Sequence, residues 1–218
     1  MSAFRALVAE YRFAPSMKRA SRSFGYSLMA IASQESVTEP EAVSVNIDDD
    51  LDLDTAVIVA LGCNDKGVWA SCREALEAAL ARFRSEGIDI VARSSWWASQ
   101  AWPDPNDPPF LNGVAIVRTA HDPHALMAAL GRIEEAFGRR RAAANAPRTL
   151  DLDLIAYGRE QGDCAGLILP HPRAADRLFV MGPLAEIAPE WRHPQTAAAA
   201  SAMITTATVG RDAHPLGR

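Results

Sequence analysis

The succession of expected strands and helices predicts an α+β protein, a ferredoxin-like βαββαβ sandwich with an added C-terminal helix. Three observations lead to this fold class. Runs rich in β-branched or aromatic residues are typical of strands, two segments carry apolar residues at helical spacing, and glycine, proline or aspartate separates these segments. Because each of the two helices is expected between strands, the chain reads as two split β-α-β units.

The first unit is expected to begin with a buried strand at residues 56–61 (AVIVAL), an apolar run that a glycine ends. Apolar side chains over residues 69–83 recur at mostly three- and four-residue steps, which predicts an amphipathic helix that Gly87 closes. Residues 88–97 are expected to form the second strand. A loop rich in proline and aspartate follows it at residues 101–109.

The second unit is expected to start with a strand at residues 110–119. Asp122 and Pro123 then form a favourable helix start, because aspartate caps free backbone N–H groups and proline fits the first helical turn. A fourth strand is expected at residues 150–157. The added helix, at residues 178–187, is expected to pack on this arrangement.

One folded domain is expected at residues 55–195, between an N-terminal extension with an acidic linker (1–54) and a C-terminal tail (196–218). Residues 1–33 carry five lysines and arginines against one glutamate, a composition that faintly resembles a transit peptide. We nevertheless expect a disordered extension or a stretch that precedes the true start, and a targeting segment is the alternative. Residues 34–54 are acidic, and we expect them to be a solvated linker.

The composition narrows the class of protein. Hydrophobic residues make up 49% and charged residues 22%, close to the average soluble globular protein. The formal net charge of -5 argues against general binding of nucleic acid. Cys63, Cys72 and Cys164 lack metal-ligand spacing, and no apolar run approaches the roughly 18 residues that span a bilayer. We therefore expect a cytoplasmic protein that binds neither membrane nor nucleic acid.

The sharpest local feature is the sequence RTLDLD at residues 148–153. Since side chains alternate faces along a strand, Asp151 and Asp153 are expected on one side, about 7 Å apart. Two carboxylates on one rigid element suit Mg²⁺ together with a polyphosphate. The alternative is an edge strand with two solvated aspartates. Residues 50–54 (DLDLD) show the same alternation without a basic partner, and we interpret them as linker.

A basic cluster precedes this strand. Arg139, Arg140 and Arg141 follow the second helix, and Arg148 lies directly before the aspartates. Guanidinium groups pair bidentately with phosphate oxygens, so arginines beside carboxylates indicate a nucleotide polyphosphate site. Alternatively, the three arginines cap the helix C-terminus, where the helix dipole favours cations. Glu134, at the edge of the helix's apolar face, could support a metal site or be a solvated acid.

Two further groups suggest binding roles. His171 lies between two prolines, and Arg177 and Phe179 follow shortly after it, so this segment could position a histidine and a cation against phosphate. Phe110 and Asn112 open the third strand, and an aromatic face with an amide suits a flat heterocycle. A structural histidine, a core phenylalanine and a strand-end asparagine are the alternatives.

Together and in this order, these segments resemble the hydroxymethyl-dihydropterin pyrophosphokinase family over about residues 56–194. The resemblance rests also on Glu134, Gly138, Arg139, Arg141, Arg177 and Phe179, and on the strings at residues 61–64 (LGCN), 110–112 (FLN), 147–153 (PRTLDLD), 170–173 (PHPR) and 183–189 (PLAEIAP). The chain departs from the usual pattern at Cys63, where the family has serine, and at Phe110, where tyrosine is more frequent.

The resemblance implies that the chain transfers pyrophosphate from ATP to the hydroxymethyl group of 6-hydroxymethyl-7,8-dihydropterin and releases AMP, a step of folate biosynthesis. Two Mg²⁺ ions would bind with ATP at Asp151 and Asp153. The other residues that it implies for catalysis and ATP binding are Glu134, Arg139, Arg141, Arg148, His171 and Arg177. Those implied for the pterin are Ser99, Trp102, Phe110, Asn112 and Phe179.

For this function we expect a monomer. Two rival functions remain open at this point. A two-metal nucleotidyl transferase or cyclase could place paired aspartates on a similar sheet, and it would release pyrophosphate after attack at the α-phosphorus. A module that binds nucleotide or pterin without turnover is the non-catalytic alternative.

Overall fold

The computed structural model describes residues 51–101, 106–138 and 148–217, which all belong to one compact unit. Nearly all of the expected N-terminal extension lies outside these residues, and the expected domain boundaries stay predictions.

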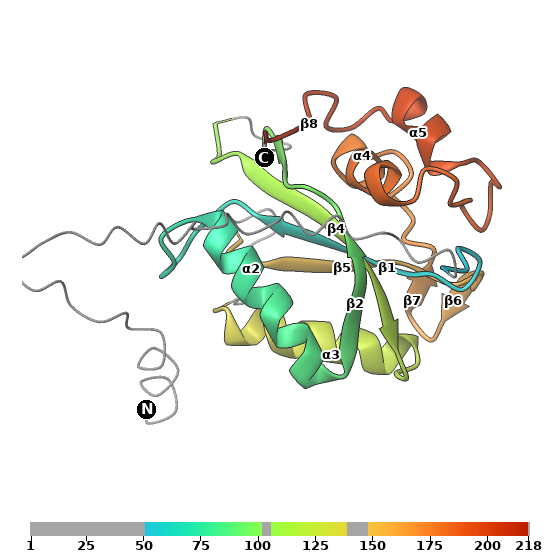
Figure 1. Cartoon of the computed structure of the whole chain (residues 1–218), viewed down its shortest axis with the longest axis horizontal. Helices are drawn as coiled ribbons and strands as arrows, with labels where there is room; N and C mark the ends of the chain where they lie inside the picture. Colours follow the sequence, from blue (N-terminus) through green and yellow to red (C-terminus); the bar gives the residue numbers. More distant parts are fainter. Residues whose placement is uncertain (1–50, 102–105, 139–147, 218) are drawn as a thin grey trace, which may run out of the picture. The chain divides into compact units, whose positions relative to one another are not determined.

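An antiparallel sheet forms the centre of the described part (Figure 1). Its strand order is β5-β1-β4-β3-β8, and β2 pairs with the other end of β4. The strands are β1 (Val57–Cys63), β2 (Ile88–Arg93), β3 (Trp97–Ser99), β4 (Phe110–Thr119), β5 (Asp151–Tyr157) and β8 (His214–Pro215). The order of β1, β2, β4 and β5 confirms the ferredoxin-like α+β prediction.

The second expected strand is divided in the structure. Both β2 and β3 pair with β4, and Ser94 lies in the break between them. The Ser94 backbone N–H donates to the Val114 carbonyl at 2.9 Å, and the Val114 N–H donates to the Ser94 hydroxyl at 3.0 Å. A side-chain hydroxyl therefore replaces a backbone acceptor here and interrupts the ladder of hydrogen bonds between the strands. As a result, β3 forms a separate strand between β4 and β8.

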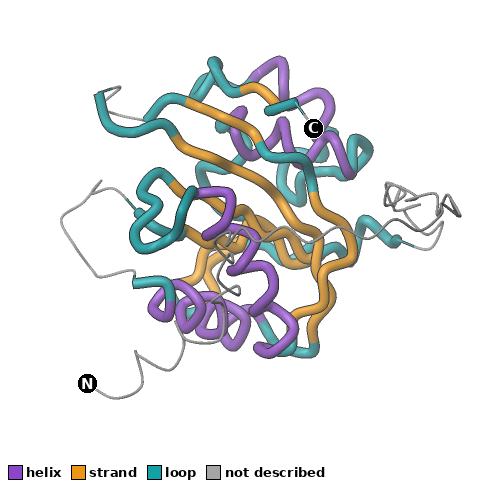
Figure 2. Tube along the Cα trace, turned by 60° about the vertical axis from the view of Figure 1, so that its left-hand side comes forward, coloured by secondary structure: helices purple, strands orange, loops and turns teal. Residues whose placement is uncertain are grey.

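Helices cover both faces of the sheet (Figures 1 and 2). On one face lie α2 (Cys72–Phe83) and α3 (Pro123–Ala136), and on the other lie α4 (Leu178–Ile187) and α5 (Ala200–Thr206). All of β1 is buried, because Val57, Val59 and Leu61 pack toward α2 and α3 while Ile58 and Ala60 pack toward α4. A continuous apolar run is what a strand covered on both faces requires.

The helix starts follow from capping residues. Ser71 caps α2 by accepting the Glu74 N–H at 3.2 Å, so this helix begins after Trp69 rather than at it. Asp122 caps α3 by accepting the Ala125 N–H at 2.8 Å, with Pro123 in the first turn, as expected.

Two regions contain structure that the sequence pattern did not indicate. A small hairpin of β6 (Gly162–Cys164) and β7 (Leu167–Leu169) precedes the segment that leads into α4. Within the expected C-terminal tail, α5 packs against α4, and β8 extends the sheet beyond β3. In the described ranges, no helix has both the length and the apolar character that crossing a bilayer requires.

Candidate functional site

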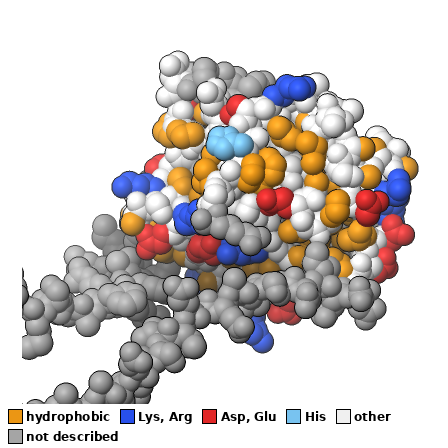
Figure 3. Space-filling view, turned by 45° about the horizontal axis from the view of Figure 1, so that its top comes forward, with side chains coloured by type: hydrophobic (Ala, Val, Ile, Leu, Met, Phe, Trp, Pro, Cys, Tyr) orange, Lys and Arg blue, Asp and Glu red, His pale blue; other side chains and the backbone are white. Residues whose placement is uncertain are grey.

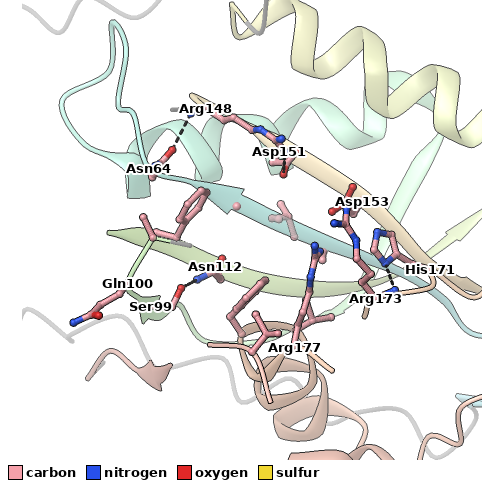
Figure 4. Close-up of a pocket in the computed structure, with 18 of the residues that line it drawn as sticks. Asn64, Ser99, Gln100, Asn112, Arg148, Asp151, Asp153, His171, Arg173 and Arg177 are labelled. Carbon is pink, nitrogen blue, oxygen red and sulfur yellow. Dashed lines mark hydrogen bonds and ion pairs between the residues drawn. The ribbon is translucent and has the colours of Figure 1, made fainter. Parts of the chain in front are cut away.

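A cavity of about 300 Å³ opens on the α4 face of the sheet, where β1, β3, β4 and β5 meet the start of α4 (Figure 4). Its lining divides into two ends. The charged end consists of Arg148, Asp151, Asp153, His171, Arg173 and Arg177, and the aromatic-amide end consists of Ser99, Gln100, Phe110, Asn112 and Phe179. Figure 4 shows Asp153, His171 and Arg173 away from Ser99, Gln100 and Asn112.

The carboxylates of the charged end come from alternate residues of β5. Asp151 and Asp153 line the cavity, whereas Leu152 and Leu154 pack into the core beneath α2 and α3. Opposite them on β1, in register, lie two small residues, Gly62 beside Asp151 and Ala60 beside Asp153. The expected alternation is therefore present, and small partners leave space above the sheet next to the carboxylates.

The backbone around Arg148 is held by Asn64, which is buried. The Arg148 N–H donates to the Asn64 Oδ1 at 2.8 Å, and the Arg148 carbonyl accepts from the Asn64 N–H at 3.1 Å. The Arg148 guanidinium forms an ion pair with Asp151. Asn64 Nδ2 also donates to the Pro108 carbonyl at 3.2 Å, so one amide connects the segment that precedes β5 to the loop that precedes Phe110.

A histidine and two arginines extend the charged end. The Arg173 N–H donates to His171 Nδ1 at 3.2 Å, which leaves the ring proton of neutral His171 on Nε2. Burial lowers the pKa of His171, Arg177 and Arg173 lower it further, and Asp153 opposes the shift. Burial also lowers the pKa of Arg177, which remains far above neutral pH as arginine does in proteins. We therefore treat His171 as a neutral donor beside cationic arginines.

The aromatic-amide end combines two rings with a fixed amide. Phe110 comes from β4 and Phe179 from α4, and the Arg177 guanidinium lies 5.6 Å from the centre of the Phe179 ring. Asn112 and Ser99 are both buried, and Asn112 Nδ2 donates to Ser99 Oγ at 3.0 Å. That bond fixes the orientation of the amide, so its oxygen is directed by the protein before any ligand binds.

The structure brings most of the expected site residues to this cavity. They are Ser99, Phe110, Asn112, Arg148, Asp151, Asp153, His171, Arg177 and Phe179. Trp102, Arg139 and Arg141 lie outside the described residues.

Glu134 is placed differently from the other expected residues. It lies on α3 and does not belong to the cavity lining, and its Oε1 accepts the Leu152 N–H at 2.7 Å. Because β5 is the outer strand of the sheet on that side, this carboxylate satisfies a backbone donor on the strand's outer edge. The bond braces β5 between the two aspartates, and a role for Glu134 in ATP binding stays a prediction.

Some lining residues were absent from the expectations. Asn64 belongs to the string at residues 61–64, and an asparagine directly after an apolar strand was the signal that could have indicated it. Val209, in contrast, lines the cavity from a segment of alanines and threonines that has no distinctive pattern. Cys63 faces the core under α2 rather than the cavity, and burial raises the pKa of its thiol.

Asp151 and Asp153 suit a metal ion that takes only part of its ligands from the protein and the rest from a bound substrate. Among the described residues, no group of three or more histidine, cysteine, aspartate or glutamate side chains could hold a metal ion. Mg²⁺ uses only one or two carboxylates when substrate phosphates and water supply the remaining oxygens. Asp151 and Asp153, with arginines beside them, fit that case. On the face in Figure 3, cationic and anionic side chains are interspersed with hydrophobic ones.

Comparison with known proteins gives consistent matches. The family model "7,8-dihydro-6-hydroxymethylpterin-pyrophosphokinase (HPPK)" matches residues 58–189. The 2-amino-4-hydroxy-6-hydroxymethyldihydropteridine pyrophosphokinase of Synechocystis is 46% identical over 110 residues, 50% of this chain and 56% of the relative. That of Pseudomonas aeruginosa is 40% identical over 139 residues, 63% of this chain and 83% of the relative. The match thus spans about half the length of the Synechocystis relative.

Among solved structures, a crystal structure of wild-type HPPK-DHPS from Plasmodium falciparum with pteroate has a TM-score of 0.53 to this chain at 12% identity. The match covers 69% of this chain and 44% of that one. At this identity the likeness concerns the fold, and it agrees with the sheet order and the helix layers described above.

Proposed function

Because the chain belongs to the 7,8-dihydro-6-hydroxymethylpterin-pyrophosphokinase family, we propose that it transfers pyrophosphate from ATP to 6-hydroxymethyl-7,8-dihydropterin. AMP would be released, as a step of folate biosynthesis. One observation carries the proposal. A single cavity holds a carboxylate pair with arginines at one end and two aromatic rings with an oriented amide at the other.

The charged end suits the triphosphate. Arg148 and Arg177 supply guanidinium groups, which can pair bidentately with phosphate oxygens. Neutral His171 carries its ring proton on Nε2 and can donate a hydrogen bond from that nitrogen to a phosphate oxygen. Asp151 and Asp153 would hold two Mg²⁺ ions together with ATP. Such ions would neutralise the negative charge of the phosphate groups.

The aromatic-amide end suits the pterin. Phe110 and Phe179 offer ring faces for stacking on a flat heterocycle. Asn112, oriented by Ser99, offers its amide oxygen to the N–H groups on the edge of the ring. Gln100 and Ala101 also border this end of the cavity, and backbone groups other than the Gln100 N–H, which Asp212 accepts, would complete the hydrogen bonds to that edge.

In the proposed reaction, the hydroxymethyl oxygen attacks the β-phosphorus of ATP in line. The new bond joins that oxygen to the β-phosphorus, while the bond from the β-phosphorus to the oxygen bridging the α-phosphate breaks. AMP leaves with the bridging oxygen, and the hydroxyl proton passes to solvent. The chain's own residues contribute position and charge, because phosphoryl transfer needs little base strength.

The test is product analysis with the purified full-length chain, Mg-ATP and 6-hydroxymethyl-7,8-dihydropterin. We expect AMP in amounts that depend on the pterin, with no free pyrophosphate. Formation of ADP, or of pyrophosphate with a nucleotidyl product, would place the attack at another phosphorus and contradict the proposal. Absence of turnover with intact nucleotide binding would leave a binding module. Activity without added divalent cation would contradict the Mg²⁺ assignment alone.

A further inference from the structure

The C-terminal residues 207–217 approach the cavity although they lie beyond the family match, which ends at residue 189. Val209 is part of the lining, next to residues of α4 and the segment before it. The segment runs from the end of α5 through β8. We refer to residues 207–217 as the C-terminal strap.

The strap attaches first to β3. Its strand β8 pairs with β3 through Trp97 opposite Pro215 and Ala98 opposite His214. The Leu216 N–H donates to the Trp96 carbonyl at 2.8 Å, directly before β3 begins. A short strand of three residues, β3, thereby gains a partner on its second edge. Its last residue, Ser99, orients Asn112, so the strap supports the strand that fixes the amide.

The second attachment comes from Asp212. Its carboxylate accepts a hydrogen bond from the Gln100 N–H. Gln100 follows β3 immediately and lines the aromatic-amide end. Hydrogen bonds from a backbone N–H to a carboxylate are stronger than neutral ones, so this contact fixes the backbone where the strand becomes the cavity wall.

The third attachment holds the strap against α4. The Val209 N–H donates to the Asp176 carbonyl at 2.9 Å, and the Leu178 N–H donates to the Val209 carbonyl at 2.9 Å. Next comes Gly210, with a φ of +67°, where a β-carbon would lie 2.4 Å from the Phe179 ring. Only glycine accommodates both the conformation and the ring. The strap therefore passes directly over the aromatic ring that borders the cavity.

We infer that the C-terminal strap is a positioning element for the heterocycle and that Asp212 is a positioning residue of pterin recognition. Asp212 fixes the backbone at Gln100, and Gly210 allows the strap to hold the Phe179 ring. This inference rests on the proposed function, because it assigns the aromatic-amide end to the pterin. When the wall is already ordered in the free protein, pterin binding does not have to meet the entropic cost of ordering it. Loss of the contact should therefore weaken pterin binding and leave the ATP end unchanged.

The experiment compares three variants of the full-length chain. Asp212→Ala removes the acceptor, and Asp212→Asn retains an acceptor oxygen without the charge. Asp163→Ala is the matched control, since its carboxylate accepts the Gly166 N–H at 2.6 Å in the β6–β7 hairpin, outside the cavity lining. For Asp212→Ala we expect the KM for the pterin to rise about tenfold, equivalent to about 1.4 kcal/mol. The kcat and the KM for ATP should stay within about twofold of the wild type.

The conservative variant separates positioning from surface charge. Asp212→Asn should restore the KM for the pterin to within about threefold of the wild type, because an amide oxygen can accept the same N–H. A pterin KM in Asp212→Ala equal to the wild-type value would overturn the inference. So would an equal rise in the KM for ATP, or an Asn variant as impaired as the Ala variant.

Hydrogen exchange at the Gln100 amide tests the contact independently of turnover. We expect this amide to exchange slowly in the wild type and the Asp163→Ala variant, and faster in Asp212→Ala. Rapid exchange in the wild type would overturn the inference even if Asp212→Ala failed to fold. An inactive wild type with a protected Gln100 amide would contradict the proposed function and leave the strap's contact standing. The two failures are therefore distinguishable.

Discussion

The two ends of the cavity are assembled from very different stretches of sequence. At the charged end, Arg148, Asp151 and Asp153 lie within six residues, and the strand β5 sets the spacing of the two aspartates. At the aromatic-amide end, Asn112 is oriented by Ser99, and the strap reaches the wall at Gln100 from 112 residues away along the chain. The geometry of one strand therefore fixes the carboxylate pair of the first end, whereas contacts between distant segments fix the wall of the second end.

This difference predicts that the two ends fail in different ways. A change at the charged end removes groups that neutralise charge developing in the reaction, so it should lower kcat. A change at the aromatic-amide end alters how well the wall is formed before the pterin arrives, so it should raise the KM for the pterin.

The largest effect is expected for Asp153→Ala. Loss of this carboxylate from the charged end should lower kcat about a thousandfold, since several kcal/mol of charge stabilisation would be lost. The side chain lies on the cavity side of β5, so we expect the free energy of unfolding to change by less than about 1 kcal/mol. Steady-state kinetics and urea unfolding measure the two quantities.

Asp163→Ala again serves as the control and should retain wild-type kcat. A kcat near the wild-type value in Asp153→Ala would contradict the assignment of β5 to the metal and the triphosphate. A comparable fall in both variants would point to a general loss of structure.

The second prediction concerns Asn64, which connects the two ends. Asn64→Ala leaves the Arg148 N–H and the Pro108 carbonyl without their partner, and we expect about 1–3 kcal/mol lower stability. Because both contacts are lost, kcat should fall and the KM for the pterin should rise together, each by roughly tenfold.

Asn64→Asp sharpens this test, because the carboxylate retains the acceptor for Arg148 and loses the donor to Pro108. We expect kcat close to that of the wild type and a raised KM for the pterin. If kcat falls as far as it does in the Ala variant, Asn64 does not connect the two ends in the way that its hydrogen bonds indicate.

The same contrast explains what the sequence predicted. The alternation of Asp151, Leu152 and Asp153 defines a strand, a core face and a cavity face from a few letters. The helix at residues 178–187 was equally readable, because an apolar run of that length matches a buried helix. These features depend on neighbours in the chain, which the sequence shows directly.

Three features that depend on distant neighbours were not predicted. The division of the second strand arises from the Ser94 hydroxyl bonding to Val114 on another strand. The strap owes its position to Gly210 beside Phe179 and to Asp212 beside Gln100, and nothing local to residues 207–217 indicates either contact. Glu134 was predicted at the ATP site from its place in the resemblance, whereas its described contact is with the backbone of β5.

A third prediction decides between those two roles for Glu134. Glu134→Ala leaves the buried Leu152 N–H unsatisfied and should lower stability by about 1–3 kcal/mol. Glu134→Gln retains an oxygen acceptor, so its stability should stay within about 1 kcal/mol of the wild type. If Glu134 also contacts ATP, Glu134→Gln should raise the KM for ATP at unchanged stability. An unchanged KM for ATP would restrict its role to bracing β5.

The smallest effect is expected from His193, which does not line the cavity. Its titration should therefore change the stability of the fold and not the catalytic site. Burial, and then Arg159, lower the pKa of His193 below its usual value, so the folded protein resists protonation at this ring. As the pH falls below about 6.5, the unfolded chain takes up a proton that the folded protein does not, and the free energy of unfolding decreases. Unfolding of the wild type and of His193→Gln at pH 7.5 and 5.5 measures this contribution. The wild type should lose more stability on acidification than the variant, and equal losses would show that other groups carry the pH dependence.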